Sequence, residues 1–525
     1  MTAAEEIVSG SKVRVGAAMP PMRSLALCLV FIALPICTLF IFADPERSWA
    51  NYADQELTLA YNAILIQSGL RQELYDHTGF VTIYMLSKYI AVKSAIMDGL
   101  ISQVSQLNDG RYFDVFHQLV TYSREFAALC AYLMASSVFF LLLMLGLRPI
   151  PSVLLAIAYG FSTGAVVHFE QLRTEPLSLL PALGSAFLFS RSVSAMNPGS
   201  FGKAILPFVI LSLAFVNKIQ VMIYCLLYFG AFLLLQRNPP LVVTPRGDVV
   251  RHAGLLTGVH FFSVALILSI LGLLVSVPRH ATSWWSVAIF GFFFLVGGLI
   301  AYLRDHAWNQ RRLRESLHLY AIEFGGLYMA GLLCAFLLVM ILSQNPLVFI
   351  QVTNPANLFL YSTHAPALDS HKVQLLSLPL QHVLDPVGTS WHYFGATLVA
   401  AVASRRIMER RDWWALAFFV AAWYLIDLTS SIRYLAPHYL IYSEVMLLLM
   451  LVYFLRKLKS STVVTLLCAG ILAGSVAATV PITIEKLQSN FGQEATYCTS
   501  TFIKDWHRLI NHEAFLKECT NRGLP

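Results

Sequence analysis

The chain has 525 residues, of which 57% are hydrophobic and 12% charged, and its net charge is +7. About a quarter of the residues of a soluble domain are charged, so this composition excludes an ordinary soluble protein and predicts an all-α polytopic membrane protein. The basic residues lie in the turns between apolar runs, which is how membrane proteins are oriented. This distribution argues against a nucleic-acid partner.

The N-terminal part predicts one helix followed by a long loop. Residues 1–23 are polar and expected in the cytoplasm, and the run 24–43 is too long for a signal-peptide core, so we expect a retained first helix. The loop 45–124 contains an apolar stripe at helical spacing and an apolar run, 80–92, that is too short to span. Both predict interfacial helices with one face toward lipid. The stripe consists of Leu57, Ala60, Tyr61 and Ile64.

Twelve further apolar runs complete a bundle of about 13 transmembrane helices, within a range of 11 to 14, if a span takes about 20 residues. They make residues 24–482 one transmembrane domain, which includes a second polar loop at 344–392. A polar tail, 483–525, follows. The runs cover 125–147, 151–167, 177–190, 203–216, 219–235, 254–277, 284–303, 320–343, 393–404, 413–429, 438–455 and 462–482.

The count of lysines and arginines predicts the orientation. With the N-terminus inside, the inside connections hold basic clusters, whereas the short outside connections hold one cation each; long loops are exempt from the rule. Loops 45–124 and 344–392, the turn 168–176 and the tail are then outside. The chain has no N-glycosylation sequon, which favours a bacterial inner membrane over the endoplasmic reticulum. The outside cations are Arg173, Lys218, Arg279 and Arg433, and one inside cluster is Arg405, Arg406, Arg410 and Arg411.

Six of the eight cysteines lie in apolar runs, where a cysteine usually serves as a small packing residue. Cys498 and Cys519 lie together in the polar tail. If the tail is in an oxidising compartment, these two cysteines are candidates for a disulfide.

Four polar segments are expected at the outer ends of the spans. In the first, Asp54 precedes the apolar stripe, so it could cap a helix or act as a general base on an acceptor hydroxyl. Glu56 could complement the helix dipole or take part in catalysis. Asp76 and His77 follow in the same loop and are candidates for acceptor binding or support.

The other three segments carry charges next to span ends. Glu175 precedes a proline that is typical of a helix start, and with Arg173 it is a candidate for acceptor support. Lys218 lies beside hydrocarbon, where it could snorkel or serve a function. Arg433, with Tyr434, could anchor a helix at the interface or bind a phosphate.

The outer loop 344–392 could close over a substrate as a lid. His364, His371 and Lys372 are its candidate contacts. Three histidines in this loop also suggest a metal site, but their spacing matches no regular ligand pattern.

These segments resemble, in the same order, segments of the GT-C glycosyltransferases, and the nearest subgroup is that of the protein mannosyltransferases and aminoarabinose transferases. Tyr52-Ala-Asp-Gln-Glu with Tyr75-Asp-His-Thr-Gly is similar to the family's first outer loop, and Leu213-Ala-Phe-Val-Asn-Lys218 to its Leu-x-x-Leu-x-Lys turn. Glu175-Pro176 matches an acid-proline pair, and Arg433-Tyr434-x-x-Pro437 an Arg-Tyr-x-x-Pro segment. The likeness covers residues 24 to about 455.

The resemblance implies a GT-C-like fold and a polyprenyl-phosphate-linked sugar as donor. Asp54 would be the catalytic carboxylate, Lys218 and Arg433 would bind the donor phosphate, and Glu175 would assist the acceptor or a metal. No cofactor is firmly implied; a divalent cation, Mg or Mn, would use Asp54 and Glu175. The chain departs from the pattern at Gln55, which replaces the second acid and moves it to Glu56, and at Thr78-Gly79, which replace two prolines.

The expected partners are therefore the lipid-linked donor, an acceptor that is a glycan, a lipid or a protein, and membrane lipid. Two other functions fit the composition. A transporter or flippase for lipid-linked sugars would place polar residues and discontinuous helices at mid-membrane. A polysaccharide ligase or polymerase outside the GT-C class would share the donor chemistry without this order of segments.

Overall fold

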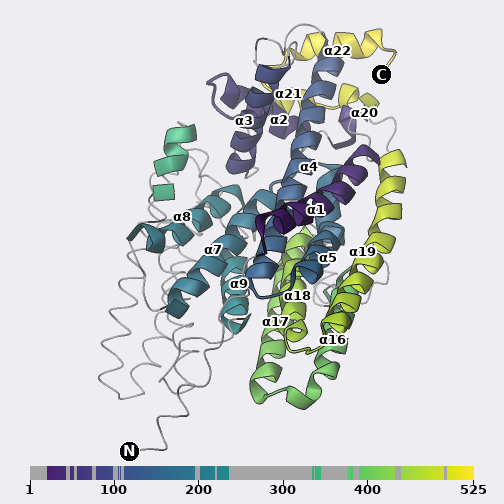
Figure 1. Cartoon of the computed structure of the whole chain (residues 1–525). Helices are drawn as coiled ribbons and strands as arrows, with labels where there is room; N and C mark the ends of the chain where they lie inside the picture. The colour runs from purple at the N-terminus through teal and green to yellow at the C-terminus, as the bar shows by residue number, and fades with distance from the viewer. Residues whose placement is uncertain are drawn as a thin grey trace, which may run out of the picture.

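The computed structural model is helical throughout the part of the chain that it describes (Figure 1). Described are residues 20–42, 48–52, 56–73, 79–97, 105, 107, 111–195, 201–218, 221–235, 389–431, 439–489 and 494–524, with parts of 331–343 and 377–381. The predicted spans 254–277 and 284–303 lie outside these residues, as do most of 320–343 and of the loop 344–392.

The helices follow most of the apolar runs expected from the sequence. They are α1 (Met22–Phe42), η1 (Trp49–Tyr52), α2 (Glu56–Gln67), α3 (Phe80–Ile96), α4 (Tyr112–Met144), α5 (Pro149–Gly160), α6 (Thr163–Glu170), α7 (Pro176–Ala195), α8 (Phe201–Asn217), α9 (Val221–Leu235), α16 (Ser390–Ala403), η4 (Arg405–Ile407), α17 (Arg410–Ser431), α18 (Leu440–Leu455), α19 (Ser461–Ser489), α20 (Glu494–Thr499), α21 (Phe502–Trp506) and α22 (His512–Asn521).

Three described helices are long and apolar enough to cross a membrane: Met22–Ile41, Tyr112–Met144 and Ser461–Pro481. The first and third are mostly exposed along their apolar windows, 17% and 22% buried, whereas the second is 67% buried. Apolar side chains exposed along a long helix are stable only in an apolar solvent such as lipid. The prediction of a helical membrane protein is confirmed at this level.

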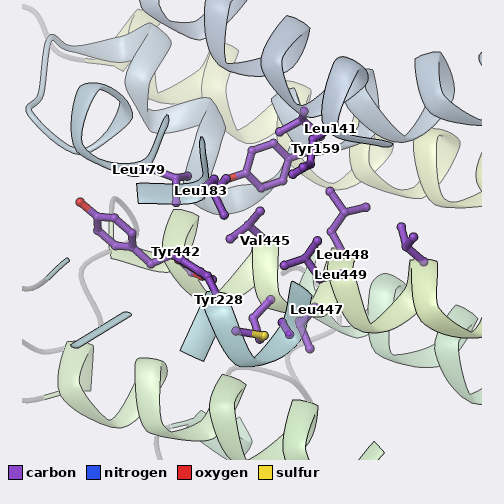
Figure 2. Packing of buried hydrophobic residues seen from close by; sticks show 14 of the residues in the cluster. Leu141, Tyr159, Leu179, Leu183, Tyr228, Tyr442, Val445, Leu447, Leu448 and Leu449 are labelled. Carbon is purple, nitrogen blue, oxygen red and sulfur yellow. The ribbon is translucent and has the colours of Figure 1, made fainter. Parts of the chain in front are cut away.

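The centre of the bundle is α18, all of whose residues are buried. Figure 2 shows its Val445, Leu448 and Leu449 packed against side chains of neighbouring helices. Two tyrosine hydroxyls tie other helices to its first turn: Tyr159 of α5 donates to the Ile441 carbonyl at 2.8 Å, and Tyr228 of α9 to the Tyr442 carbonyl at 2.7 Å. A helix that is apolar on all sides is typical of a buried position.

The run 151–167, predicted as one span, forms two helices that meet at Phe161 and Ser162. Ser162 caps α6 by accepting a hydrogen bond from the Ala165 N–H, the usual role of serine at a helix start. A 12-residue helix such as α5 is about 18 Å long, shorter than the hydrocarbon core of about 30 Å. The prediction of one continuous span over 151–167 is therefore wrong, and the bundle contains a helix break at this point.

A second hydrophobic core lies beyond the bundle, at the end where α2, α20 and α22 meet in Figure 1. We call it the loop–tail domain; it comprises η1, α2, α3, the N-terminal half of α4 and α20–α22. The 33-residue α4 is about 50 Å long, so it runs through both cores. The loop predicted to extend to residue 124 therefore ends at Tyr112, where α4 begins.

The two helices predicted inside this loop are present, but only one keeps an exposed face. In α3, Met85 and Val92 are exposed while Ile83 and Leu86 are buried. The residues of α2 from Glu56 to Leu65 are all buried, because α3, α4 and the tail surround it. The expectation that α2 lies in the interface with one face toward lipid is wrong.

The tail is fastened to α4 by its last helix. Phe515 is fully buried and stacks on Phe113, with ring centroids 5.9 Å apart. The Glu518 carboxylate accepts hydrogen bonds from the Tyr112 and Phe113 N–H groups at 2.5 and 3.4 Å, so an acid of the tail caps the positive end of the α4 dipole. The described parts of the first loop and of the tail thus lie at one end of the molecule.

Candidate functional site

A buried ion pair joins the start of α7 to the end of α8. Lys218 Nζ lies 2.8 Å from Glu175 Oε1, and the side chains are 13% and 1% exposed. Glu175 precedes Pro176, and its carbonyl accepts from the N–H groups of Ser178 and Leu179, so the predicted helix start is present. The carboxylate lies at the positive end of one helix and the ammonium at the negative end of another, which stabilises both charges.

Asn217, next to this pair, connects three helices through its buried amide. Its Oδ1 accepts from the N–H and the hydroxyl of Thr82 at 3.0 and 3.1 Å. Its Nδ2 donates to the Thr174 carbonyl and to Ser178 Oγ at 2.8 and 2.9 Å. A buried amide satisfied on both sides fixes its surroundings, so Asn217 holds the starts of α3 and α7 against the end of α8.

Gly79, just before α3, lies against the turn that precedes α7. Its φ is +137°, and a Cβ added to it would lie 2.5 Å from Thr174 Cγ2. Only glycine adopts this conformation without strain and leaves room for Thr174. The glycine therefore allows the first loop to contact the turn before α7.

Two tyrosines at the start of α18 complete this group of residues. The ring centroid of Tyr439 lies 5.4 Å from Lys218 Nζ, a distance at which a cation is attracted to an aromatic face. Tyr442, in the first turn of α18, is fully buried, and its ring centroid lies 5.0 Å from that of Tyr224. We call Glu175, Asn217, Lys218, Tyr439 and Tyr442 the polar junction.

The polar junction contains Glu175 and Lys218 of the second and third expected segments, and Tyr439, two residues after Pro437 of the fourth. Gly79, which ends the first segment, and Thr82 lie against it through Thr174 and Asn217. Several predicted site residues lie outside the described residues. They are Asp54, Asp76, His77, Arg433 and Tyr434, and the loop residues His364, His371 and Lys372.

Glu56 lies apart from the polar junction, inside the loop–tail domain. Its carboxylate accepts from Arg124 Nε at 3.2 Å and from Nη2 at 3.0 Å, and the two side chains are 0% and 1% exposed. Arg124 also donates to the Ser48 carbonyl at 2.8 Å. A general base must reach the acceptor hydroxyl, whereas this carboxylate faces an arginine inside the core. Its position suits a residue that fixes the chain next to Asp54.

Arg173, predicted to support the acceptor, is half-buried in the turn before α7. With the Gln171 amide oriented to satisfy its neighbours, the amide oxygen accepts from Arg173 Nε and Nη2 at 2.7 and 2.9 Å. The guanidinium is thus held by its own turn, two residues from Glu175.

The residues that sequence reasoning missed surround Glu444 of α18. This fully buried carboxylate accepts from Ser162 Oγ at 2.5 Å, from the Gly164 N–H at 2.9 Å and from Thr389 Oγ1 at 2.8 Å. It thereby caps α6 at the helix break and ties α18 to the start of α16. The available signal was an acid inside an otherwise apolar run, together with a serine at helix-cap spacing from Ala165.

A metal finds little support among the described residues. They contain no group of three or more histidine, cysteine or acidic side chains that could hold an ion. Glu175, one of the two carboxylates considered for a divalent cation, is engaged by Lys218. Because an ammonium already neutralises this carboxylate, Glu175 in this arrangement does not fit a dication, and we derive no step through a metal.

The two tail cysteines offered as a disulfide pair are bonded to each other, with a separation of 21 residues along the chain. The bond joins α20 to α22, close to Phe515.

No family model, curated protein or solved structure matches this chain. The fold and the junction therefore define it as a helical membrane protein with a buried, charged junction at one end of its bundle.

Proposed function

We propose that the protein is a multi-pass glycosyltransferase of GT-C architecture, with about 13 spans, in a bacterial inner membrane. It would transfer a sugar from a polyprenyl-phosphate donor to an acceptor at the periplasmic face, with the N-terminus in the cytoplasm and the tail in the periplasm. The observation that carries this proposal is that residues from or next to four separate polar segments meet at the polar junction, beside the start of α18.

The proposed reaction needs a base, a cationic site and a groove for the lipid. Asp54 accepts the proton of the acceptor hydroxyl while the hydroxyl oxygen bonds to the anomeric carbon of the sugar. The bond from that carbon to the phosphate oxygen breaks, and its electron pair stays on the phosphate. Lys218 and Arg433, with the hydroxyl of Tyr434, stabilise the charge that develops there; such stabilisation is usually the largest catalytic term.

The ion pair between Lys218 and Glu175 gives this scheme a resting state. Lys218 is held by a carboxylate until a phosphate competes for the ammonium. The hydrogen bonds of Asn217 fix the end of α8 against the starts of α3 and α7. Lys218 therefore needs to move only its side chain to exchange the Glu175 carboxylate for a phosphate. Glu56 and Arg124 hold the chain that carries Asp54.

The test of the assigned base is sugar transfer by purified protein from a panel of polyprenyl-phosphate sugars, with wild type compared with Asp54→Asn. The amide keeps the size of the side chain and removes the base, so transfer should fall by a factor of 10² or more. Undiminished transfer by the variant would remove Asp54 from the mechanism. Glu513→Gln, which changes an exposed acid of the loop–tail domain, is the matched control and should keep its activity.

A second candidate is a flippase or transporter for lipid-linked sugars. It is favoured by the break between α5 and α6 and by the buried Glu444 beside it, because transporters place discontinuous helices at their binding sites. Liposomes that translocate a labelled lipid-linked sugar without transferring it would support this candidate. Transfer of whole polysaccharide chains would instead indicate a ligase or polymerase.

A further inference from the structure

The turn between α16 and α17 gathers positive charge at the end of the bundle opposite the loop–tail domain (Figure 1). Arg405 and Arg406 lie in η4, and Arg410 and Arg411 begin α17; all four are exposed. We call residues 405–414 the basic turn. The proposed catalytic scheme uses none of these residues.

The acidic residues of the basic turn do not cancel this charge. Asp412 is buried, and its carboxylate already accepts the Tyr453 hydroxyl at 2.7 Å and lies 2.8 Å from Lys457 Nζ. Glu409 is the single exposed acid of the turn, and Lys459, after α18, is a further exposed cation. The basic turn, all of whose residues are described, therefore carries four exposed arginines and one exposed glutamate.

Exposed aromatic surface follows the arginines directly. Trp413 is 59% exposed, Trp414 67% and Ile407 50%. Tryptophans concentrate at the interface between lipid headgroups and hydrocarbon, and these two occupy the first turn of an apolar helix. An interfacial position of these tryptophans would set the neighbouring guanidinium groups at headgroup depth, where the planar fork of arginine binds phosphate oxygens in pairs.

We propose that the basic turn is a binding surface for anionic phospholipid headgroups, with the phosphates on the arginines and the acyl chains against Trp413 and Trp414. Two features favour a lipid over a soluble anion or an acidic protein: the tryptophans lie next to the arginines, and the helix they begin is apolar. Attraction to an anionic leaflet adds for each basic residue near the surface and weakens with salt. This inference is independent of the proposed glycosyl transfer.

The experiment measures retention of phosphatidylglycerol and of phosphatidylcholine by purified full-length protein, using native mass spectrometry at two salt concentrations. Wild type should retain the anionic lipid about tenfold more strongly, and the preference should shrink as salt rises. Arg405→Gln with Arg406→Gln should abolish most of the preference, while two arginines remain in the turn to maintain orientation. Arg71→Gln with Lys517→Gln removes the same charge from exposed positions of the loop–tail domain and should leave the preference unchanged.

Equal retention of the two lipids by wild type, or an equal loss in the control variant, would overturn the proposal and leave the turn to another partner. A second measurement does not depend on the glutamine variant folding. Phosphatidylglycerol with brominated acyl chains should quench the fluorescence of wild type more than brominated phosphatidylcholine does. That difference should disappear in Trp413→Phe with Trp414→Phe, and its persistence there would place the lipid elsewhere.

Discussion

The contact between Lys218 and Glu175 has a structural and a proposed catalytic role, and the two can be separated. Lys218→Ala leaves a buried carboxylate without its cation, which costs about 3–5 kcal/mol. The double variant Glu175→Gln with Lys218→Gln removes both charges, so we expect its thermal unfolding in detergent to approach that of wild type. Sugar transfer should remain low in both variants, because neither has the ammonium. Recovery of transfer in the double variant would reduce the pair to a structural role.

Which residues of the junction were predictable depends on their chemistry. Glu175 and Lys218 are ionisable groups at span ends, which sequence alone marks as costly. Asn217 carries no charge, and its importance comes from four hydrogen bonds to Thr82, Thr174 and Ser178. Such bonds join residues up to 135 positions apart, and no local pattern specifies them. Gly79 likewise becomes necessary only when Thr174 is in place.

At the scale of elements, the helix break next to Glu444 depends on a close approach of backbones. A Cβ on Gly164 would lie 2.2 Å from the Ile441 nitrogen and 2.6 Å from Glu444 Oε2. Gly164→Ala should therefore lower the free energy of unfolding by about 1–3 kcal/mol, measured by thermal or denaturant unfolding in detergent. Gly184→Ala in α7 is the matched control: nothing lies within 4 Å of its added Cβ, so stability should be unchanged or slightly raised. Equal effects at both sites would contradict this account of the break.

The disulfide should stabilise the loop–tail domain as a unit. The bond closes a loop of 21 residues and so lowers the entropy of the unfolded chain, which raises the free energy of unfolding by about 3 kcal/mol. Cys498→Ser with Cys519→Ser should speed hydrogen exchange in α22 and at the N-terminus of α4, because Phe515 and Glu518 dock there. Cys37→Ser changes a free, exposed cysteine of α1 and should leave exchange unchanged. Unaltered protection in the double variant would show that the aromatic contacts suffice without the bond.

The elements themselves show what periodicity can and cannot predict. Apolar runs located most of the described helices, because burial in lipid or in a core needs a long apolar stretch in either case. The same reasoning missed the break inside 151–167, where Ser162 and Glu444 outweigh the apolar pattern. It also placed α2 in the interface, because an apolar stripe has the same spacing whether lipid or protein covers it. The N-terminal extension of α4 through residues 112–124 was hidden by its polar residues: Ser123 and Arg124 bond to Glu56 of α2, and Asp114 pairs with Arg522 of the tail.

For the whole molecule, the two hydrophobic cores predict two separable unfolding events, and acid should loosen one of them first. His507 is fully buried in the loop–tail domain against the Tyr61 ring, with centroids 4.8 Å apart. Burial lowers the pKa of His507 from 6.5 to about 3. As pH falls below 6.5, His507 is protonated in the unfolded state but stays neutral in the folded state. Its contribution to the free energy of unfolding is therefore complete above pH 6.5 and declines as pH falls toward 3. The slope is about 1.4 kcal/mol per pH unit for one proton.

We therefore expect hydrogen exchange in α22 to rise between pH 6.5 and 5, after correction for intrinsic rates, while α18 stays protected. Carboxyl groups with ordinary pKa values are still ionised in this interval, so they contribute little to the change. His507→Leu keeps an apolar side chain against Tyr61 and cannot titrate, so its exchange in α22 should depend less on pH. If α18 and α22 lost protection together, the bundle and the loop–tail domain would form one cooperative unit, with α4 transmitting the loss from one core to the other.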